Sequence, residues 1–499
     1  MNYIKEAKEL VRNLNQRMGP SAYDIGWLAR LRNSATGNAR WPDLIEWLLE
    51  NQRPDGSWGG EIVYYHDRII CTLIAIIALR ENGHTRQAQR SIERGERYLW
   101  HHLHLLPRDP FELVGFELIF PTLLAEALTL GLDVPTHTCG YGEIQTAKLC
   151  LIPHQMLYSP RISTVHSLEF LGKTGDPERL RKALTSNGSL GNSPAATAYY
   201  LLLLGYDDEK SLAYLEAVQE HAGHTIYLYP FSTFELTWVL NNLTFCGLPI
   251  IEFASQDIWK RLLSEVETTG VGLDPVFGIP DADTTSVCVY LLASAGYDVD
   301  PLVLAQFEDK ERHIFRTYHY ERNPSVSTNI HALEALNLIP DYPGRRKTQD
   351  QIVVMLLNSR KYNIYWTDKW HASPYYVTAH ALVALLRESP YVVAQACRHT
   401  VDWIVHTQRD DGSWGFFEFG TAEETAYALT ALLHHNRYEP VAPDVLHRGA
   451  AYLTRMYQGS DSIYPELWLG KNLYIPRDVV RSMALTALIL YDETFGRSP

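Results

Sequence analysis

Apolar residues recur along most of the chain at positions that lie on one face of a helix. Residues 69–79 and 118–128 show this spacing clearly, and it is typical of helices that bury one stripe against a core. The alternation of apolar and polar residues that marks a half-buried strand is nearly absent. We therefore predict an all-α protein.

A short repeated segment indicates how the helices are arranged. Residues 47–59 are echoed by residues 403–415, and residues 187–191 form a degenerate third copy. Alanine-rich helical segments occupy residues 72–79, 197–204, 378–385, 425–432 and 482–490. Small side chains allow close packing, so these segments are interpreted as inner helices of α/α-barrels, each paired with an outer helix such as residues 45–51. The Asp-Gly-Ser-Trp-Gly turn should stop the outer helix, and its Trp should pack back on the neighbouring helix.

The spacing of the copies predicts two barrels. One copy lies near residue 50 and the other near residue 410, and residues 227–230 (Tyr-Leu-Tyr-Pro) interrupt the helical pattern between them. A chain of 499 residues is long enough for two such domains, each with a core of its own.

The net charge limits the classes of partner that the sequence allows, and the cysteine content indicates the cellular compartment. The formal charge of −14 argues against a nucleic-acid partner, because a phosphate-binding surface needs a basic excess. The six cysteines are scattered without a Cys-x-x-Cys pair, as expected in a reducing compartment. No run reaches the length of a membrane span, and residues 1–17 lack the apolar core of a signal peptide. We expect a soluble cytoplasmic protein without an integral membrane segment.

Two carboxylates stand one residue apart in residues 280–286 (Pro-Asp-Ala-Asp-Thr-Thr-Ser), just before an apolar helical segment. Asp281 can serve as N-cap, which leaves Asp283 in the first turn. Such a pair is either a capping device or a proton donor. In a low-dielectric site two like charges cannot both form easily, so one carboxyl keeps its proton. A helix N-terminus favours the charged form, so burial must outweigh it.

Further segments match a known family in an order that runs almost end to end. They are residues 21–27, 115–121, 315–318, 324–331, 368–376, 421–427 and 468–474. With the repeated turns and the Asp-x-Asp-Thr-Thr stretch, they resemble class II terpene cyclases, and particularly the bacterial diterpene members that make halimadienyl and kolavenyl diphosphates. The resemblance implies a β barrel formed by residues 1–19 and 226–499, a γ barrel of residues 20–225 inserted between them, and an active-site cavity between the barrels.

The resemblance also implies catalytic roles. The residues concerned are Asp283, Asp281, Thr284, Thr285, His331 and Asn329. By family position Asp283 protonates an alkene of the substrate, Asp281 polarises or orients it, and the two threonines fix its rotamer. His331 is linked to Mg²⁺ response and product control, and His331 and His319 are candidates for the base that takes the final proton.

A carbocation that migrates through the substrate needs apolar walls with aromatic faces. The pocket candidates are Tyr290, Trp366, Trp370, Tyr375, Tyr376, Trp414 and Phe416.

The diphosphate head of the substrate would be held by cations and Mg²⁺. Lys369, Lys471 and Arg316 fall in matched motifs and are the candidates. The metal ligands stay open. Plant members carry a run of acids before the segment at 115–121, of which this chain keeps only Asp109, and Glu112 or Glu117 could substitute.

We expect cyclisation of geranylgeranyl diphosphate to a bicyclic halimane- or clerodane-type diphosphate. The sequence has no Asp-Asp-x-x-Asp element for ionising a diphosphate, so the product should keep that group and pass to a separate diphosphate-removing enzyme. One alternative is a sesquiterpene cyclase that makes drimenyl diphosphate from farnesyl diphosphate. Another is a non-catalytic α/α-barrel binding protein, in which the two aspartates only cap a helix. The oligomeric state stays open.

Overall fold

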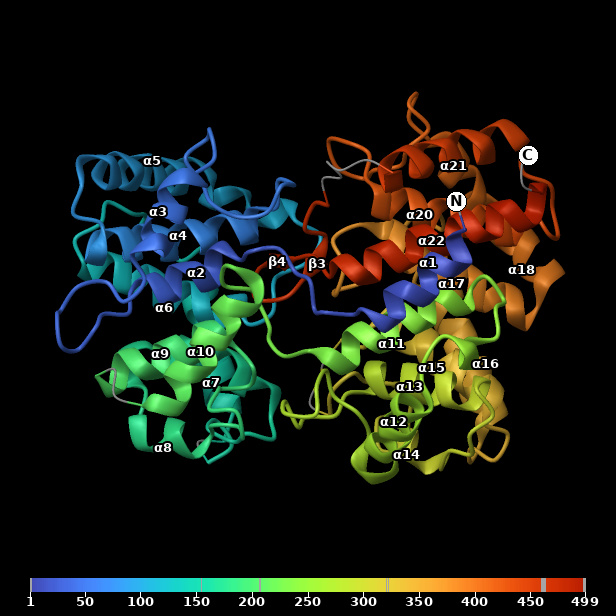
Figure 1. Ribbon diagram of the computed structural model, residues 1–499, viewed down its shortest axis with the longest axis horizontal. Coiled ribbons are helices and arrows are strands. Elements are labelled where there is room, and N and C mark those ends of the chain that lie inside the picture. The colour runs from blue at the N-terminus through green and yellow to red at the C-terminus, as the bar shows by residue number, and fades with distance from the viewer. Residues whose placement is uncertain are drawn as a thin grey trace.

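The computed structural model describes residues 2–153, 155–205, 208–319, 321, 323–458 and 464–496. Helices dominate these residues, and the named strands form only two antiparallel hairpins in the described parts of the chain. The helices gather in two lobes (Figure 1). The prediction of an all-α protein is confirmed.

The first lobe, at the left of Figure 1, follows the chain from blue to green. Its elements are α2 (Ala22–Ala29), α3 (Pro42–Glu50), α4 (Tyr65–Asn82), α5 (Arg86–His102), η1 (Leu103–Arg108), α6 (Phe116–Thr129), α7 (Tyr141–Leu151), η2 (Ser163–Thr174), α8 (Pro177–Lys182), α9 (Pro194–Leu204) and α10 (Glu209–Ala222). Helix α2 contacts α4, and contacts continue through α6, η2 and α9 back to α2. These elements form a closed inner ring.

The second lobe contains the remaining helices. They are α1 (Tyr3–Arg12), α11 (Ser232–Thr244), η3 (Ile250–Glu252), α12 (Gln256–Thr269), α13 (Ala282–Ser294), α14 (Leu302–Ala305), α15 (Val326–Leu338), α16 (Arg345–Asn358), α17 (Pro374–Glu388), α18 (Pro390–Ala396), α19 (Arg398–His406), α20 (Ala422–His435), α21 (Pro443–Gln458) and α22 (Arg477–Phe495). A short hairpin of β1 (Glu308–Asp309) and β2 (Ile314–Phe315) lies before α15. Helices α11, α13, α15, α17, α20 and α22 contact one another in this order, and α22 closes the ring on α11.

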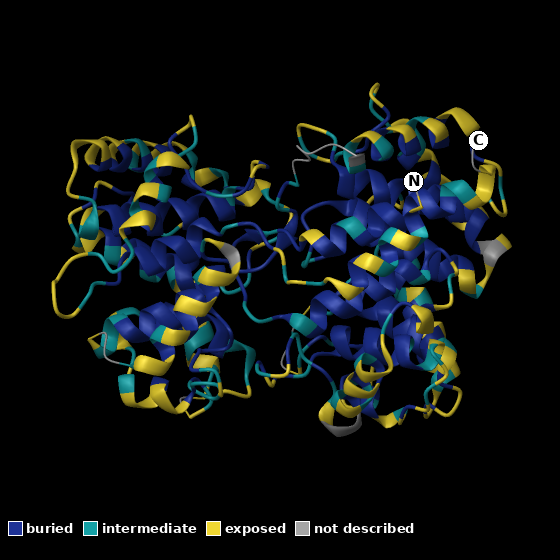
Figure 2. Cartoon of the chain, in the orientation of Figure 1, coloured by how far each residue is buried: buried dark blue, intermediate teal, exposed yellow. Residues whose placement is uncertain are grey.

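The burial pattern separates inner from outer helices. In Figure 2 dark blue residues concentrate on the central helices of each lobe, and yellow residues lie on the outer ones. The alanine-rich segments of the sequence all fall in inner helices: α4, α9, α17, α20 and α22. These observations confirm the α/α-barrel prediction. Within the described residues, none of the helices combines the length and apolar character needed to cross a bilayer.

Three tryptophans hold outer helices to inner ones with the same pair of hydrogen bonds. The residues are Trp58, Trp366 and Trp414. In each, the indole Nε1 donates to the carbonyl ten residues earlier, at 2.6–2.7 Å, and the backbone N–H donates to a threonine hydroxyl on the next inner helix. In the last of these turns, Gly412 has φ of +90°, and a Cβ there would lie 2.5 Å from the carbonyl oxygen of Arg448. Any larger residue would therefore strain the turn.

A hairpin near the end of the chain joins the lobes. It consists of β3 (Trp468–Leu469) and β4 (Leu473–Tyr474), and Figure 1 shows it in red between them. Its Gly470 carbonyl accepts from Val114 N–H, and Leu473 N–H donates to Asp67, so it binds the first lobe. Leu467 O accepts from Ala372 N–H of the second lobe.

The N-terminal helix α1 packs on α22 and α11 of the second lobe. The chain then runs through the first lobe and returns to the second between α10 and α11 (Figure 1). The predicted boundaries at residues 19 and 225 fall in these two crossings. As limits of independent domains they stay a prediction.

Candidate active site

A cavity of about 310 Å³ lies between the lobes, within the size range of small-molecule sites. The first lobe lines it with α6 and η2, and the second lobe with α11, the start of α13 and the β3–β4 hairpin. Asp281, Asp283 and Thr284 belong to its wall. The acid pair therefore faces the cavity between the lobes.

Local structure around the acid pair follows from capping. Asp281 is the N-cap of α13, and its Oδ1 accepts from Thr284 N–H at 2.6 Å while its Oδ2 accepts from the Thr284 hydroxyl at 3.0 Å. Asp283 stands in the first turn. Both carboxylates are buried. The predicted capping arrangement is confirmed, and it lies inside the protein.

A histidine from the neighbouring inner helix binds the second carboxylate. His331 on α15 places Nδ1 2.6 Å from Asp283 Oδ1. Burial lowers the pKa of His331, but the charge of Asp283 and this hydrogen bond outweigh burial and leave the pKa above its usual value. The imidazole therefore donates Nδ1–H to Oδ1, which leaves Oδ2 of Asp283 as the oxygen able to carry a proton into the cavity.

Burial is also the largest influence on the pKa of Asp281. It raises the pKa of Asp281, the backbone N–H of Thr284 lowers it, and the negative charge of Asp283 raises it again, to about 8. Burial thus outweighs the helix N-terminus at Asp281, and this carboxyl is neutral at pH 7. The pair holds at most one easily formed negative charge.

The polar neighbours of the acid pair act differently from their predicted roles. Thr284 binds Asp281 rather than Asp283, and Thr285 exchanges hydrogen bonds with the backbone of Val271. Asn329 binds the backbone of Phe315 on β2 through both ends of its amide. His331, and neither threonine, holds the Asp283 carboxylate. Asn329 instead fastens β2 to α15.

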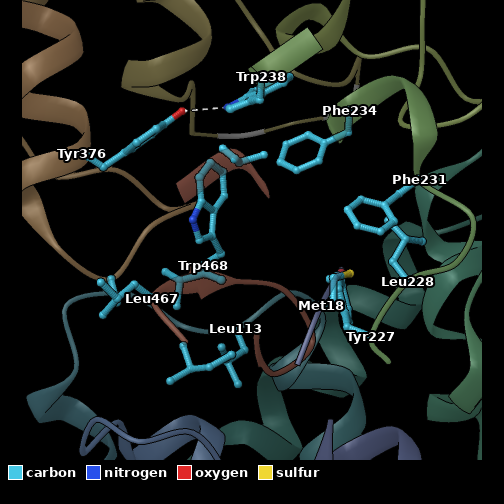
Figure 3. Close-up of a cluster of buried hydrophobic side chains, with 14 of the residues drawn as sticks. Met18, Leu113, Tyr227, Leu228, Phe231, Phe234, Trp238, Tyr376, Leu467 and Trp468 are labelled. Atoms are coloured by element: carbon cyan, nitrogen blue, oxygen red, sulfur yellow. Dashed lines mark hydrogen bonds between the residues drawn. The ribbon is translucent and has the colours of Figure 1, made fainter. Parts of the chain in front are cut away.

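Aromatic rings cover much of the second-lobe wall (Figure 3). Of the predicted pocket residues, Trp370 and Tyr376 line the cavity. Phe234 and Trp238 of α11 and Trp468 of β3 join them, and Trp238 Nε1 donates to Tyr376 Oη at 3.3 Å. Figure 3 shows Tyr227, Leu228 and Phe231 gathered at one side of the cluster.

Prediction from sequence missed most of these rings. Phe234 and Trp238 lie four residues apart on one face of α11, and Phe231, the residue that precedes the helix, stands three positions earlier. That spacing was the available signal. Nothing local to the sequence indicates that this face meets a cavity and not the core.

The other predicted pocket residues are absent from the described lining of this cavity: Tyr290, Trp366, Tyr375, Trp414 and Phe416. Trp366 and Trp414 are the helix-joining tryptophans described above. Tyr375 stacks on Trp403 at 4.7 Å, and Tyr290 binds Arg387. Phe416 is 44% exposed.

The three predicted diphosphate cations are already paired with protein groups. Lys471 on the hairpin is fully buried and binds Glu169 at 2.7 Å and Ser193 at 2.6 Å. Arg316 binds Asp309 at 2.6 Å. Lys369 pairs with Glu321 and donates to the Asn323 carbonyl at 2.7 Å. None of them lines the cavity among the described residues, so the structure does not support these assignments.

Several polar groups line the first-lobe wall of the cavity. Glu117 of α6 lines the cavity and pairs with Lys148 of α7. Ser163, Thr164 and Ser167 of η2 add hydroxyls to the same wall. Asp109 instead binds His66 at 2.7 Å, and Glu112 accepts from Tyr141. Of the three predicted acids, only Glu117 faces the cavity.

A histidine in the cavity wall was missed. His166 of η2 is buried, its Nδ1 lies 2.8 Å from the Gly191 carbonyl, and its Nε2 has no hydrogen-bond partner among the described residues. Burial, reinforced by the charge of Lys471, lowers its pKa to about 3. Nδ1 therefore carries the hydrogen, and Nε2 presents a lone pair. His319, in contrast, is exposed and stacks on Phe307.

The arrangement combines an acid, aromatic walls and a neutral base around one cavity. An acid in such a site can protonate a weakly basic carbon because no water competes for the proton. Aromatic faces stabilise the resulting positive charge without attacking it. This geometry is suited to proton-initiated rearrangement of an apolar substrate.

Comparison with known proteins gives consistent findings. No family model matches the chain. A Mycobacterium tuberculosis protein named type B diterpene cyclase is 35% identical, over 96% of this chain and 97% of its own. The (+)-kolavenyl diphosphate synthase of Herpetosiphon aurantiacus is 30% identical, over 97% of each. The structure of ent-copalyl diphosphate synthase from Streptomyces platensis superposes with a TM-score of 0.81 at 28% identity, covering 98% of this chain and 99% of that one.

Proposed function

The chain belongs to the bacterial class II diterpene cyclases, and from this premise we propose that it cyclises geranylgeranyl diphosphate to a bicyclic halimane- or clerodane-type diphosphate. The expectation of an enzyme is confirmed by this membership, which sets aside the binding-protein alternative. One observation supports the proposal most directly: a buried Asp283–His331 pair at the wall of an aromatic cavity.

Protonation of the terminal alkene starts the reaction. The O–H bond at Asp283 Oδ2 breaks as a C–H bond forms at the alkene carbon. The Nδ1–H of His331 stabilises the carboxylate that remains on Asp283, at 2.6 Å. Neutral Asp281 adds no second charge beside it. Both effects lower the free energy of the charge-separated state relative to an isolated acid.

The cation then migrates along the second-lobe wall. Phe234, Trp238 and Trp468 offer ring faces around the cavity, and such faces stabilise positive charge without a nucleophile. Migration by hydride and methyl shifts is the step that separates halimane and clerodane skeletons from an unrearranged one. We propose it here because one relative is named a kolavenyl diphosphate synthase.

Loss of a proton ends the reaction, and we assign this step to His166. His166 belongs to the first-lobe wall of the cavity, whereas the acid belongs to the second-lobe wall, and its Nε2 has no partner among the described residues. A low pKa is sufficient because a carbocation is a far stronger acid than imidazolium. The C–H bond breaks, its electron pair forms the product alkene, and Nε2 takes the proton.

The diphosphate belongs at the first-lobe end of the cavity, where Glu117 lines the wall. Lys148 pairs with Glu117 there and, like the three cations predicted from sequence, is not itself part of the described lining. Mg²⁺ fits this end, because it is commonly held by one or two carboxylates together with substrate phosphates and water, and Glu117 is the carboxylate available. When bound, Mg²⁺ would neutralise part of the diphosphate charge. Retention of the diphosphate requires that a separate enzyme remove it from the product.

Product analysis tests the proposal. Purified protein with geranylgeranyl diphosphate and Mg²⁺ should give, after phosphatase treatment, a bicyclic C20 alcohol with a halimane or clerodane skeleton by mass spectrometry and NMR. Farnesyl diphosphate should give little drimane alcohol. An unrearranged labdane skeleton would contradict the proposed product, and cyclisation of farnesyl diphosphate alone would contradict the substrate.

The proposed position of the diphosphate near Lys148 leads to a separate prediction about KM. Lys148→Ala should raise KM for geranylgeranyl diphosphate roughly 10- to 100-fold, the value of a hydrogen bond to a charged group, because a cation near the diphosphate is lost. Steady-state kinetics at fixed Mg²⁺ measure this change. Lys148→Arg, which keeps the charge, is the matched control and should stay within a few-fold of wild type. Equal KM values for the alanine variant and wild type would place the diphosphate elsewhere.

A further inference from the structure

A second cavity of about 310 Å³ adjoins the β3–β4 hairpin, which also forms part of the active-site wall. Leu469 and Tyr474 line the active-site cavity, whereas Asn472 and Leu473 line the second one. Its other walls come mainly from the end of α3, the turn after it and the start of α4. No step of the proposed cyclisation involves this second cavity, which we call the hairpin pocket.

Acidic side chains dominate the charge of the hairpin pocket. Its lining contains four acidic residues and one basic residue: Glu50, Glu61, Asp67, Glu466 and Arg53. Burial raises the pKa of Glu466, backbone hydrogen bonds lower it, and the charges of Asp67 and Glu61 raise it again. Because these like charges repel one another, a positive ligand would lower the free energy of the group.

Two amide oxygens in the same lining lack partners. Asn472 is 2% exposed, and its Nδ2 donates to the Leu473 carbonyl at 2.7 Å. Gln52 Nε2 donates to the carbonyls of Gly56 and Ser91, each at 2.9 Å. Asn472 Oδ1 and Gln52 Oε1 are buried and have no hydrogen-bond partner among the described residues. Since the amide nitrogens already donate, these oxygens are acceptors that need a donor.

Side-chain donors in the lining are already used inside the protein. Asn51 Nδ2 donates to the Trp47 carbonyl at 2.9 Å. Arg53 donates to the Gly59 carbonyl at 3.0 Å and to Glu61 at 3.1 Å. The lining therefore offers acceptors and negative charge, and it suits a ligand that brings N–H donors and positive charge.

An organic cation meets these requirements better than a metal ion does. The ligands of a metal ion must converge on one point, and in the described part of the chain no group of three or more His, Cys, Asp or Glu side chains is placed to hold one. Trp47 adds an aromatic ring to the lining, and aromatic rings attract organic cations. Ammonium groups joined by an alkyl chain satisfy all of these features.

We propose that the hairpin pocket binds a small organic diamine or polyamine. Its ammonium N–H groups donate to Asn472 Oδ1 and Gln52 Oε1, and its charges pair with Glu50 and Glu466. Such a ligand contacts the first lobe and the hairpin together, so its binding stabilises the joint between the lobes. Binding at this place does not depend on the proposed cyclisation.

Titration calorimetry with putrescine tests the proposal on the whole protein, without substrate. In about 0.15 M salt, which screens loose attraction to surface charges, we expect one saturable site with a Kd below about 1 mM. Saturating putrescine should also raise Tm by about 1–3 °C, because a ligand that binds only the folded state stabilises it. Tetramethonium has the same charge and alkyl spacer but no N–H group, and it should bind at least about tenfold more weakly.

Matched variants locate the site. Asn472→Leu removes the unpartnered oxygen and should raise the Kd for putrescine at least about tenfold. Glu50→Gln keeps the shape of a side chain outside the hairpin and should raise this Kd about threefold. Glu46→Gln makes the same charge change one turn earlier on α3, at an exposed position outside the lining, and should leave the Kd unchanged. Circular dichroism checks each fold, and Glu50→Gln keeps the test decisive if Asn472→Leu does not fold.

Three results would overturn the proposal. The first is the absence of saturable heat with putrescine up to about 10 mM. The second is equal affinity for putrescine and tetramethonium, which would mean attraction between charges alone. The third is an unchanged Kd in both Asn472→Leu and Glu50→Gln, which would place the diamine elsewhere on the protein. A protein that binds putrescine but cyclises neither diphosphate would overturn only the proposed function.

Discussion

Asp283→Asn should lower the rate of cyclisation by at least about 1000-fold, since the substitution removes the proton that starts the reaction. The amide keeps the size of the side chain and can still accept from His331, so the fold should persist. Mass spectrometry of phosphatase-treated products, with circular dichroism as a check on the fold, measures both effects.

Asp281→Asn is the informative control for this variant. Asp281 also lines the cavity and holds a proton at neutral pH, so it competes for the role of donor. Both of its oxygens, however, accept hydrogen bonds from Thr284, whereas among the described residues the hydrogen bond to the Asp283 carboxylate goes to Oδ1 and not to Oδ2. We expect Asp281→Asn to retain more activity than Asp283→Asn. The reverse order would make Asp281 the donor.

Lys471→Met should lower the free energy of unfolding by about 3–5 kcal/mol, the usual cost of breaking a buried ion pair. Lys471 is fully buried, and its loss leaves the carboxylate of Glu169 without its cation. Urea unfolding followed by fluorescence measures the change. The double variant Lys471→Met/Glu169→Gln removes both charges and should recover part of the lost stability.

The same variant distinguishes a structural role from substrate binding. If Lys471 held the diphosphate, Lys471→Met would stay as stable as wild type and show a raised KM. The structure leads us to expect the opposite, a loss of stability that the Glu169→Gln change partly repairs. Lys148→Ala provides the comparison, because it should alter KM with little effect on unfolding.

The helical period and the repeated turns were sufficient to predict the barrels from sequence. Trp58 and Trp414 were recognisable because a glycine-containing turn precedes each of them in the same register. Trp366 makes the same contacts without that turn. Both Trp366 and Trp414 were predicted as pocket residues, so recognising the turn did not by itself exclude a place in the cavity. The spacing of apolar residues reveals a helix, but the contacts between different helices of the barrel cannot be read from the local sequence.

The acid pair could be predicted for a similar reason, because N-capping is a local interaction. The resemblance named His331, but not as the partner of Asp283. The contact between the two residues spans 48 positions of the chain. The residues predicted to bind the diphosphate are not in the cavity lining. In sequence, a lysine in a matched motif looks the same whether it faces a ligand or a buried carboxylate. Lys471 and Lys148 differ only in what the other lobe and neighbouring helices place beside them.

The hairpin that joins the lobes has a consequence for biosynthesis. A ribosome completes the first lobe long before it reaches Lys471, and domains generally fold as they emerge. Until the hairpin arrives, Glu169 and the Asp67 carboxylate lack the partners that the finished protein gives them. The nascent first lobe should therefore remain partly open, and a cavity able to shelter a carbocation exists only once almost the whole chain has been translated.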